Sequence, residues 1–485
     1  MEQHQNRKLV SDTTKVTGAV GLAYLINLIG GLFIAHILGA SRYGVWKAVQ
    51  LVMEYTAYSN LGSNHGIDRQ CPALVSANQN SQYKRLLSTS ITFSLILSGL
   101  FSLIFFLLSL HSTSQDWRIA FAGLGFLIIF QQLFINGDSA LGAEKKFGRK
   151  SFLLLLQTAA RVILSIIFGY AFGLGGVVSV FVVVLAVCAV LQLRSLRISW
   201  TFQLSKPLLR RLIFSGSSIT FLVLCERMIL NADRIAVGFA LGEKAFGIYQ
   251  MAMFPLPILL LIPFSLRQTV QTEIYDQAGK HRDISASWPV FSKSLRVVAL
   301  LTPFFAGAVF LGMPMLIHNF LEEYQGSIVL VQLFAFTSFS LQLIQILFPV
   351  VVVKGNLKRL IPQILGILLI PTIIGFIAAK QGAPLLFILG LQSVGWFVIS
   401  LWLLKKSLQW FNISRNECRS THLSTFSPIL ATAVELPLLH WLMTSVFGWS
   451  AYGFAYGILG GLLHTLLVSP FLFSVYKEIK NRRRS

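Results

Sequence analysis

The sequence predicts an all-α polytopic membrane protein with about fourteen transmembrane helices. The first observation is composition: 55% of the 485 residues are hydrophobic and 12% are charged. Soluble domains carry about twice that charged fraction. The second is that apolar blocks of roughly 20 residues, long enough to cross a hydrocarbon core, recur along the chain. The third is that these blocks lack the apolar–polar alternation of a β-barrel. Their backbone N–H and C=O groups must therefore be hydrogen-bonded within helices.

The expected spans follow from the apolar blocks and the charged or glycine-marked segments between them. In order they are 16–38, 44–62, 88–110, 117–137, 151–172, 173–193, 212–241, 247–266, 296–317, 326–353, 359–379, 383–404, 427–446 and 451–475. An even number of spans places both termini on the same side of the membrane.

The basic residues assign that side to the cytoplasm. Four of the 40 Lys and Arg residues lie in expected outside segments, namely Arg42, Arg118, Lys244 and Lys380. Four lie within spans, namely Lys47, Arg161, Arg227 and Arg234, and the other 32 lie in inside segments. Every inside segment is richer in basic residues than any outside one, as the positive-inside rule requires. The net charge of +22 therefore encodes orientation, and we do not expect a nucleic-acid partner.

The sequence offers no signature of an enzyme active site. It contains no phosphate-binding loop, no H-E-x-x-H zinc motif, no paired cysteine spacing and no nucleophile elbow. The expected outside loops are short and leave no room for an external catalytic domain. We therefore expect a transporter without a metal or another cofactor.

The two halves of the chain contain similar segments, which indicates an internal repeat. "LGASRYGVWKAV" at 38–49 and "LGEKAFGIYQMA" at 241–252 share the same spacing of glycine, aromatic and apolar residues. Each segment follows the first span of a six-span set. The glycines suit a tight turn that opens a helix, and they are Gly39 with Gly44 and Gly242 with Gly247. Chance similarity between two helical hairpins is the alternative explanation.

The repeat predicts three parts. Residues 1–200 and 201–410 are two six-helix lobes, and 411–485 holds two extra C-terminal helices and a basic cytoplasmic tail. Because six is an even number, the lobes are related by a parallel repeat, an arrangement found in secondary transporters with the substrate held between the halves.

Polar residues form helical stripes in three otherwise apolar spans. They are Lys47, Gln50, Glu54 and Tyr58; Gln157, Arg161 and Ser165; and Ser217, Thr220, Arg227, Asn231, Arg234 and Gly238, with Glu226 and Asp233 on a neighbouring stripe. Charges at this depth usually face a bundle interior or a watery cavity. Glu435, His36, His440 and His464 are weaker candidates, since an intramembrane histidine is often a packing residue.

Each stripe also has a structural interpretation. Lys47 and Glu54 would pair with adjacent spans for packing, and Arg161 would bond backbone carbonyls within its own half. Arg227 and Arg234 would be neutralised by the adjacent acidic residues. If the stripes instead line a cavity, its excess positive charge favours an anionic headgroup, above all a phosphate or diphosphate.

Three stretches resemble a known family. They are "LGASRYGVW", "SNLGSNHGIDRQCPAL" and "NADRIAVGFALGEKAFGIYQMA". With fourteen spans, they make the chain similar to Wzx-type polysaccharide flippases of the multidrug/oligosaccharidyl-lipid/polysaccharide exporter superfamily. The second lobe departs from the first, because span 247–266 carries prolines where span 44–62 carries charges.

The resemblance implies a flippase that moves undecaprenyl-diphosphate-linked oligosaccharide across the bacterial cytoplasmic membrane by alternating access, for O-antigen or other cell-surface polysaccharide. It implies a cationic lumen of Lys47, Arg161, Arg227 and Arg234, lined also by Gln50, Gln157 and Asn231. The acids Glu54, Glu226 and Asp233 become candidates for charge balance or for coupling to H⁺ or Na⁺. Membrane lipids, a polysaccharide polymerase and a chain-length regulator are the other expected partners.

Other functions stay open at this stage. A drug or cation exporter, or a lipid II flippase, belongs to the same superfamily. The exporter is disfavoured because the first span offers only Asn27 and His36 where such exporters often place a coupling acid. A membrane O-antigen polymerase or ligase would need a catalytic cluster on a sizeable outside loop.

Overall fold

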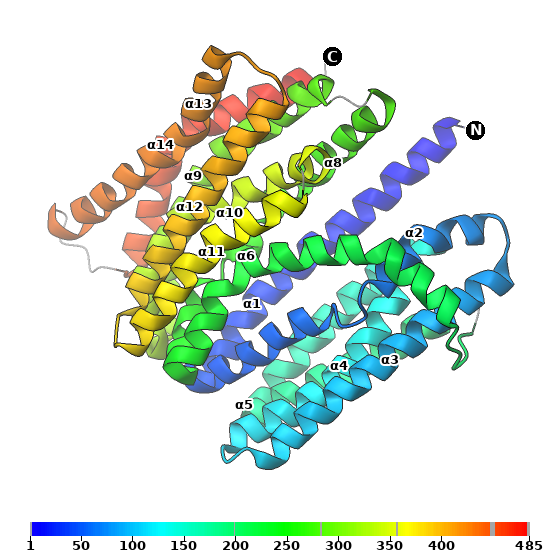
Figure 1. The fold of residues 1–485 in the computed structure, drawn as a ribbon. Helices are drawn as coiled ribbons and strands as arrows, with labels where there is room; N and C mark the ends of the chain where they lie inside the picture. Colours follow the sequence, from blue (N-terminus) through cyan, green and yellow to red (C-terminus); the bar gives the residue numbers. More distant parts are fainter. Residues whose placement is uncertain (1, 198, 282–283, 356, 447–451, 483–485) are drawn as a thin grey trace. The chain divides into compact units, whose positions relative to one another are not determined.

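A computed structural model of the chain describes the backbone of residues 2–197, 199–281, 284–355, 357–446 and 452–482. These ranges contain helices joined by turns and no β-strand (Figure 1). The prediction of an all-α polytopic membrane protein is confirmed. Contacts divide the chain into two compact units, Met1–Met228 and Ile229–Ser485. The division into 1–200, 201–410 and 411–485 stays a prediction, and the side chains of the basic tail from 477 onward lie outside the described residues.

The first unit is a bundle in which α1 packs on α4 and α5, and α4 also packs on α2 and α3. Its helices are α1 (Glu2–Thr56), α2 (Ser63–Ser76), α3 (Asn80–His111), α4 (Gln115–Ala143), α5 (Phe147–Arg194) and the first part of α6 (Lys206–Ala252). The short helix α2 lies in a segment that the sequence predicts to be a loop. It forms because its apolar residues Ile67 and Cys71, one helical turn apart, are buried in the bundle.

The second unit is built around α10, which packs on α8, α9 and α12, while α13 and α14 pack on α9. After the end of α6 come α7 (Leu256–Leu259), α8 (Leu261–His281), η1 (Ser285–Ser287), α9 (Trp288–Phe320), η2 (Glu322–Ser327), α10 (Ile328–Lys354), α11 (Leu357–Lys380), α12 (Leu385–Trp410), α13 (Arg415–Trp441), η3 (Leu442–Val446) and α14 (Phe454–Arg482). The central position of α10 agrees with its sequence, which is apolar on nearly every face.

The helices of the described residues correspond to the expected spans. Ten helical stretches are long and apolar enough to cross a membrane, and a shorter apolar helix runs from Tyr456 to Pro470. Three of the ten contain a non-helical glycine, which divides each into two legs at Gly39, Gly173 and Gly242. Dividing three of the ten stretches in two gives thirteen segments, and the short helix makes fourteen. These fourteen segments correspond to the fourteen expected spans.

The turns at Gly39 and Gly242 have nearly the same backbone conformation. Gly39 has φ 66° and ψ 170°, and Gly242 has φ 78° and ψ −177°. This region of φ/ψ space is open essentially to glycine alone, because a side chain would clash with its own backbone. Gly44 and Gly247 lie in helical backbone a few residues later. Equal turns at equivalent positions support the repeat that the sequence indicates.

Span 247–266 is not one continuous helix. α6 ends at Ala252, and α7 and α8 follow it as separate helices. Pro255, Pro257 and Pro263 explain the interruptions, because proline has no N–H for the helical hydrogen bond. The helix α8 continues past residue 266, the expected end of this span, to His281.

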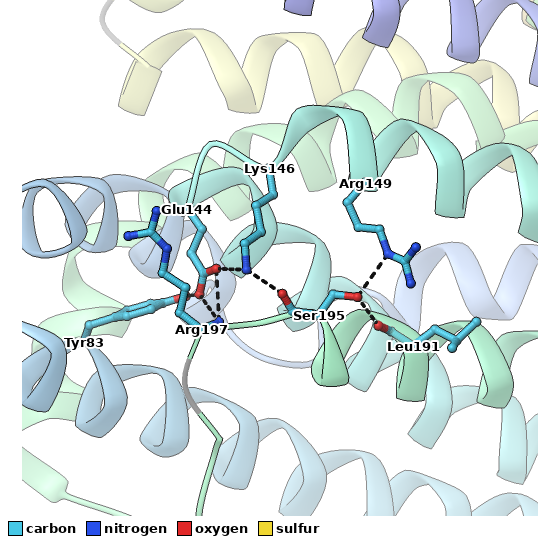
Figure 2. A network of polar contacts seen from close by, with 7 residues as sticks. All are labelled: Tyr83, Glu144, Lys146, Arg149, Leu191, Ser195 and Arg197. Atoms are coloured by element: carbon cyan, nitrogen blue, oxygen red, sulfur yellow. Dashed lines mark hydrogen bonds and ion pairs between the residues drawn. The ribbon is translucent and has the colours of Figure 1, made fainter.

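The segment that follows α5 is held to the first unit by the buried carboxylate of Glu144 (Figure 2). Glu144 accepts hydrogen bonds from the Tyr83 hydroxyl at 3.1 Å and the Arg197 backbone N–H at 3.0 Å. It also forms an ion pair with Lys146, 2.7 Å between Nζ and Oε2, and Lys146 donates to the Ser195 carbonyl. These contacts fix where the chain leaves α5 on its way to α6.

Changing Gly242 to alanine is expected to destabilise the protein by about 1–3 kcal/mol, the cost of a non-glycine residue in this conformation. A Cβ at Gly242 meets no atom within 4 Å, so the loss would come from the backbone alone. The free energy of unfolding, measured by SDS titration in mixed micelles, checks this. The control is Gly366→Ala, a helical glycine with equally open space, which should be neutral or slightly stabilising. Equal effects of the two changes would contradict the assigned turn.

Changing Glu144 to glutamine is expected to lower the free energy of unfolding by about 2–3 kcal/mol. The amide keeps the shape of the carboxylate but removes the charge that pairs with Lys146, which is 31% exposed. The same SDS titration measures the loss. Glu322→Gln, at an exposed glutamate, is the matched control and should change stability by less than about 0.5 kcal/mol. A Glu144→Gln protein as stable as the wild type would refute the anchoring role.

Candidate functional site

Arg161 lies half-buried on α5 among neutral partners in the first unit. Its Nη2 donates to Asn27 Oδ1 of α1 at 3.3 Å, and its guanidinium carbon is 4.6 Å from the ring centroid of Phe181. Trp46 packs edge-on against the same ring at 4.3 Å between centroids. The Nε atom of Arg161 is buried without a hydrogen-bond partner. In the described part of the chain, these contacts include no carboxylate.

A second group joins α1 to α6 within the first unit. Arg227 is hydrogen-bonded to the side chain of Tyr58 and lies within electrostatic range of Glu54 and Glu226. The Tyr55 hydroxyl also donates to the backbone carbonyl of Arg227 at 3.5 Å. The structure thus brings together two acids and one arginine that the sequence places on separate stripes.

The position of this group depends on a close approach of α6 to the start of α2. A Cβ on Gly216 would lie 2.0 Å from the Gly62 carbonyl oxygen, so a larger residue could not be accommodated. Gln70 on α2 donates to the Ser215 hydroxyl at 2.8 Å. Small residues let the two backbones touch, and the hydrogen bond fixes their register.

The other expected residues of the first unit lie on α1 and α5. Lys47 is half-buried with its Nζ 5.2 Å from the ring centroid of Tyr43, and Gln50 is half-buried less than one turn later. Gln157 is buried on α5, one turn before Arg161. Their roles as lumen residues stay predictions.

In the second unit, Asp233 is 1% exposed and is held by Tyr249. The Tyr249 hydroxyl donates to Asp233 Oδ2 at 2.6 Å, and Oδ1 is buried without a hydrogen-bond partner. Arg234, the adjacent residue, is half-buried with an unpartnered Nε. Asn231 is also buried, with 1% of its surface exposed. Nearby, the indole N–H of Trp396 on α12 donates to the Ile229 carbonyl at 2.9 Å, and this hydrogen bond fixes α6 against α12.

Sequence reasoning missed Arg267, which it assigned to an inside segment. Because α8 continues past the expected end of its span, Arg267 Nη1 reaches Gln345 Oε1 of α10 at 2.6 Å, and its guanidinium lies 4.8 Å from the Phe348 ring centroid. Burial raises the pKa of the Tyr275 hydroxyl, and Arg267 opposes that shift. The sequence did contain a signal for this contact: Gln342 and Gln345 lie three residues apart in an otherwise apolar span and indicate a polar partner.

A buried amide network in the first unit was also missed. Gln132 on α4 accepts from Asn60 at 3.0 Å and donates to the Thr56 carbonyl at 2.8 Å. Asn136, one turn later, accepts from the Ser90 hydroxyl at 2.8 Å. This network satisfies the backbone where α1 ends, which is a structural role. The spacing of Gln132 and Asn136 in an apolar span could have indicated it.

Changing Tyr249 to phenylalanine is expected to lower the free energy of unfolding by about 1.5–3 kcal/mol, because the buried carboxylate loses its hydroxyl donor. A double-mutant cycle with Asp233→Asn in the SDS titration separates this bond from lost packing. Tyr170→Phe, at an exposed tyrosine, is the control. Additive effects of Tyr249→Phe and Asp233→Asn would show that the bond contributes nothing.

Comparison with known proteins bears on the fold. No protein-family model and no curated protein sequence matches the chain. Its structure is similar to the lipid II flippase MurJ in an inward closed conformation, with a TM-score of 0.67, 16% identity, and coverage of 95% of this chain and 98% of that one. It is also similar to an inward-facing multidrug-resistance transporter of the MATE family, MOP superfamily, with a TM-score of 0.55, 15% identity, and coverage of 81% and 96%.

A third similar structure is a MOP superfamily transporter from Pyrococcus furiosus, described as having a binding pocket of reverse polarity. Its TM-score is 0.55 at 13% identity, with coverage of 83% of this chain and 95% of that one. Identities this low establish shared architecture and leave activity to be argued from the residues. This chain therefore has the fold of transporters of the MOP superfamily.

Proposed function

We propose that this protein is a flippase that moves an undecaprenyl-diphosphate-linked oligosaccharide across the bacterial cytoplasmic membrane by alternating access. The product would serve the synthesis of O-antigen or another cell-surface polysaccharide. Both termini would face the cytoplasm, in keeping with the distribution of basic residues. The protein acts as a transporter and catalyses no covalent step.

The observation that carries this proposal is the environment of Arg161. An arginine near the middle of a span is costly unless a counter-charge or water meets it. The partners of Arg161 are an amide and an aromatic ring, which leave its positive charge uncompensated. A diphosphate would supply the missing charge and accept two parallel hydrogen bonds from the guanidinium.

The other charged groups would adjust the electrostatics around the headgroup. Arg227 lies near Glu54 and Glu226, and Arg234 lies beside Asp233. Binding of an anion would weaken these internal pairs, because one arginine cannot form its best hydrogen bonds with both partners. This exchange gives a physical link between cargo binding and helix movement, which alternating access requires. The lipid tail would remain in the bilayer throughout.

The comparisons support a lipid-linked cargo over a drug. The similarity to MurJ, described as a lipid II flippase, extends over 95% of this chain, and that to the MATE transporter over 81%. Lipid II itself is therefore the second candidate cargo. Drug or cation export is less well supported, because Glu54, Glu226 and Asp233, the acids on the predicted stripes, lie near arginines that offset their charge.

The test is a flipping assay in cells that lack their own flippase for a defined repeat unit. The lipid-linked oligosaccharide that becomes accessible to an external glycosidase is measured with the wild type, Arg161→Gln and Arg161→Lys. We expect Arg161→Gln to reduce flipping about 10- to 100-fold, the loss of one charged bidentate contact, and Arg161→Lys to restore part of it.

Arg42→Gln is the control, because Arg42 is exposed and forms an ion pair with Asp116 in an outside segment. Membrane levels of each variant are matched by immunoblot. A parallel test in cells depleted of their lipid II flippase distinguishes the two cargoes. Failure of the wild type with every lipid-linked cargo, including lipid II, would refute the proposal, and full activity of Arg161→Gln would remove its basis.

A further inference from the structure

The two C-terminal helices contain a buried histidine held between two oxygen atoms. His464 on α14 is 1% exposed. Its Nδ1 is 2.8 Å from Oε1 of Glu435 on α13, and its Nε2 is 3.0 Å from the carbonyl oxygen of Pro303 on α9. A Cβ added at Gly307 would lie 1.9 Å from Nε2, so the missing side chain of that glycine makes room for the ring.

The hydrogen-bond roles at this histidine require a proton between the two side chains. The Pro303 carbonyl can only accept, so Nε2 carries a hydrogen. Nδ1 and the Glu435 carboxyl must then share one further proton, with either the imidazole or the carboxylic acid as donor. Without that proton, a nitrogen lone pair would face a carboxylate lone pair at 2.8 Å. The contact is stable only when the pair holds the proton.

Along the helices that pack around the pair, the sequence places the other titratable side chains several residues away. α9 has no titratable side chain between Arg296 and His318, and α10 has none before Lys354. The nearest titratable groups along α13 and α14 are His440 and Tyr456, which are hydrogen-bonded to each other at 2.6 Å. They lie five and eight residues from the pair, or about 7.5 and 12 Å along their helices.

We propose that Glu435 and His464 form an intramembrane proton-binding site. All three contributing residues lie near the middle of their expected spans, 296–317, 427–446 and 451–475. The Glu435 side chain keeps 23% of its surface exposed and the His464 side chain keeps 2%, so the proton enters and leaves through the carboxyl group. Proton binding here does not depend on the cargo. Its use to drive transport rests on the proposed function.

Release of the proton would change how the C-terminal helices pack. The Nε2–H bond to Pro303 persists, while the bond between α13 and α14 is lost and a carboxylate remains without a partner. Such a charge is unfavourable in a hydrocarbon environment, so it would draw α13 toward water. Occupancy of the site is thereby linked to the separation of these two helices.

The test is ¹⁵N NMR of the full-length protein, labelled at histidine and reconstituted in lipid bilayers. Chemical shifts report the protonation of each ring nitrogen, and His464→Gln identifies the relevant signals. Spectra are recorded from about pH 5 to 9, and loss of the shared proton would appear as a change in the Nδ1 shift while Nε2 keeps its hydrogen. In Glu435→Gln the amide cannot share an acidic proton with the ring, so the transition should move to lower pH or disappear. Tyr456→Phe is the matched control and should retain it.

Two results would overturn the proposal. A wild-type His464 with unchanged nitrogen shifts over the whole pH range would mean a permanent hydrogen bond with a structural role. An unchanged transition in Glu435→Gln would mean that the histidine titrates alone. If Glu435→Gln fails to fold, Glu435→Asp and the wild-type titration still decide. None of these readouts measures transport, so failure of the flippase proposal would leave them interpretable.

Discussion

Hydrocarbon can neither solvate a charge nor hydrogen-bond a backbone, and most features of this protein follow from that constraint. Three charged groups at depth are contacted by polar or aromatic side chains: Arg161 by Asn27 and Phe181, Arg227 by Tyr58, and Asp233 by Tyr249. Where a helix ends in the interior, as α1 does, amide side chains satisfy its carbonyls. Arg161 is distinctive because its described contacts are neutral, and this unmet charge is the basis on which we propose an anionic cargo.

Most of the fold could be predicted from the sequence, because span length and the positive-inside rule depend on composition and not on packing. The glycine turns could be located as well, since Gly39 and Gly242 occupy equivalent places in a repeated motif. The sequence did not predict the helix α2 or the extension of α8 to His281. Both are amphipathic or polar enough to look like loops, and they become helical through tertiary packing on the bundle.

The candidate site was harder to predict. Helical spacing identified Glu54, Tyr58, Glu226 and Arg227 as stripe residues, but could not say that they meet one another, because pairing depends on which faces of two helices are opposed. The same limit applied to Glu435 and His464, which are 29 residues apart and were treated as isolated polar residues. Arg267 was missed for another reason: it lies one residue beyond the expected span, on a helix that continues to His281.

The central claim is that the deep cations recognise a diphosphate headgroup. The most direct measurement is native mass spectrometry of the purified protein with equal amounts of a polyprenyl-diphosphate oligosaccharide and the corresponding polyprenyl-monophosphate sugar. The account predicts about tenfold or greater preference for the diphosphate, reflecting one additional charged contact, and a smaller preference when Arg161 is replaced by glutamine. Equal binding of the two lipids, or a preference that Arg161→Gln leaves unchanged, would contradict it.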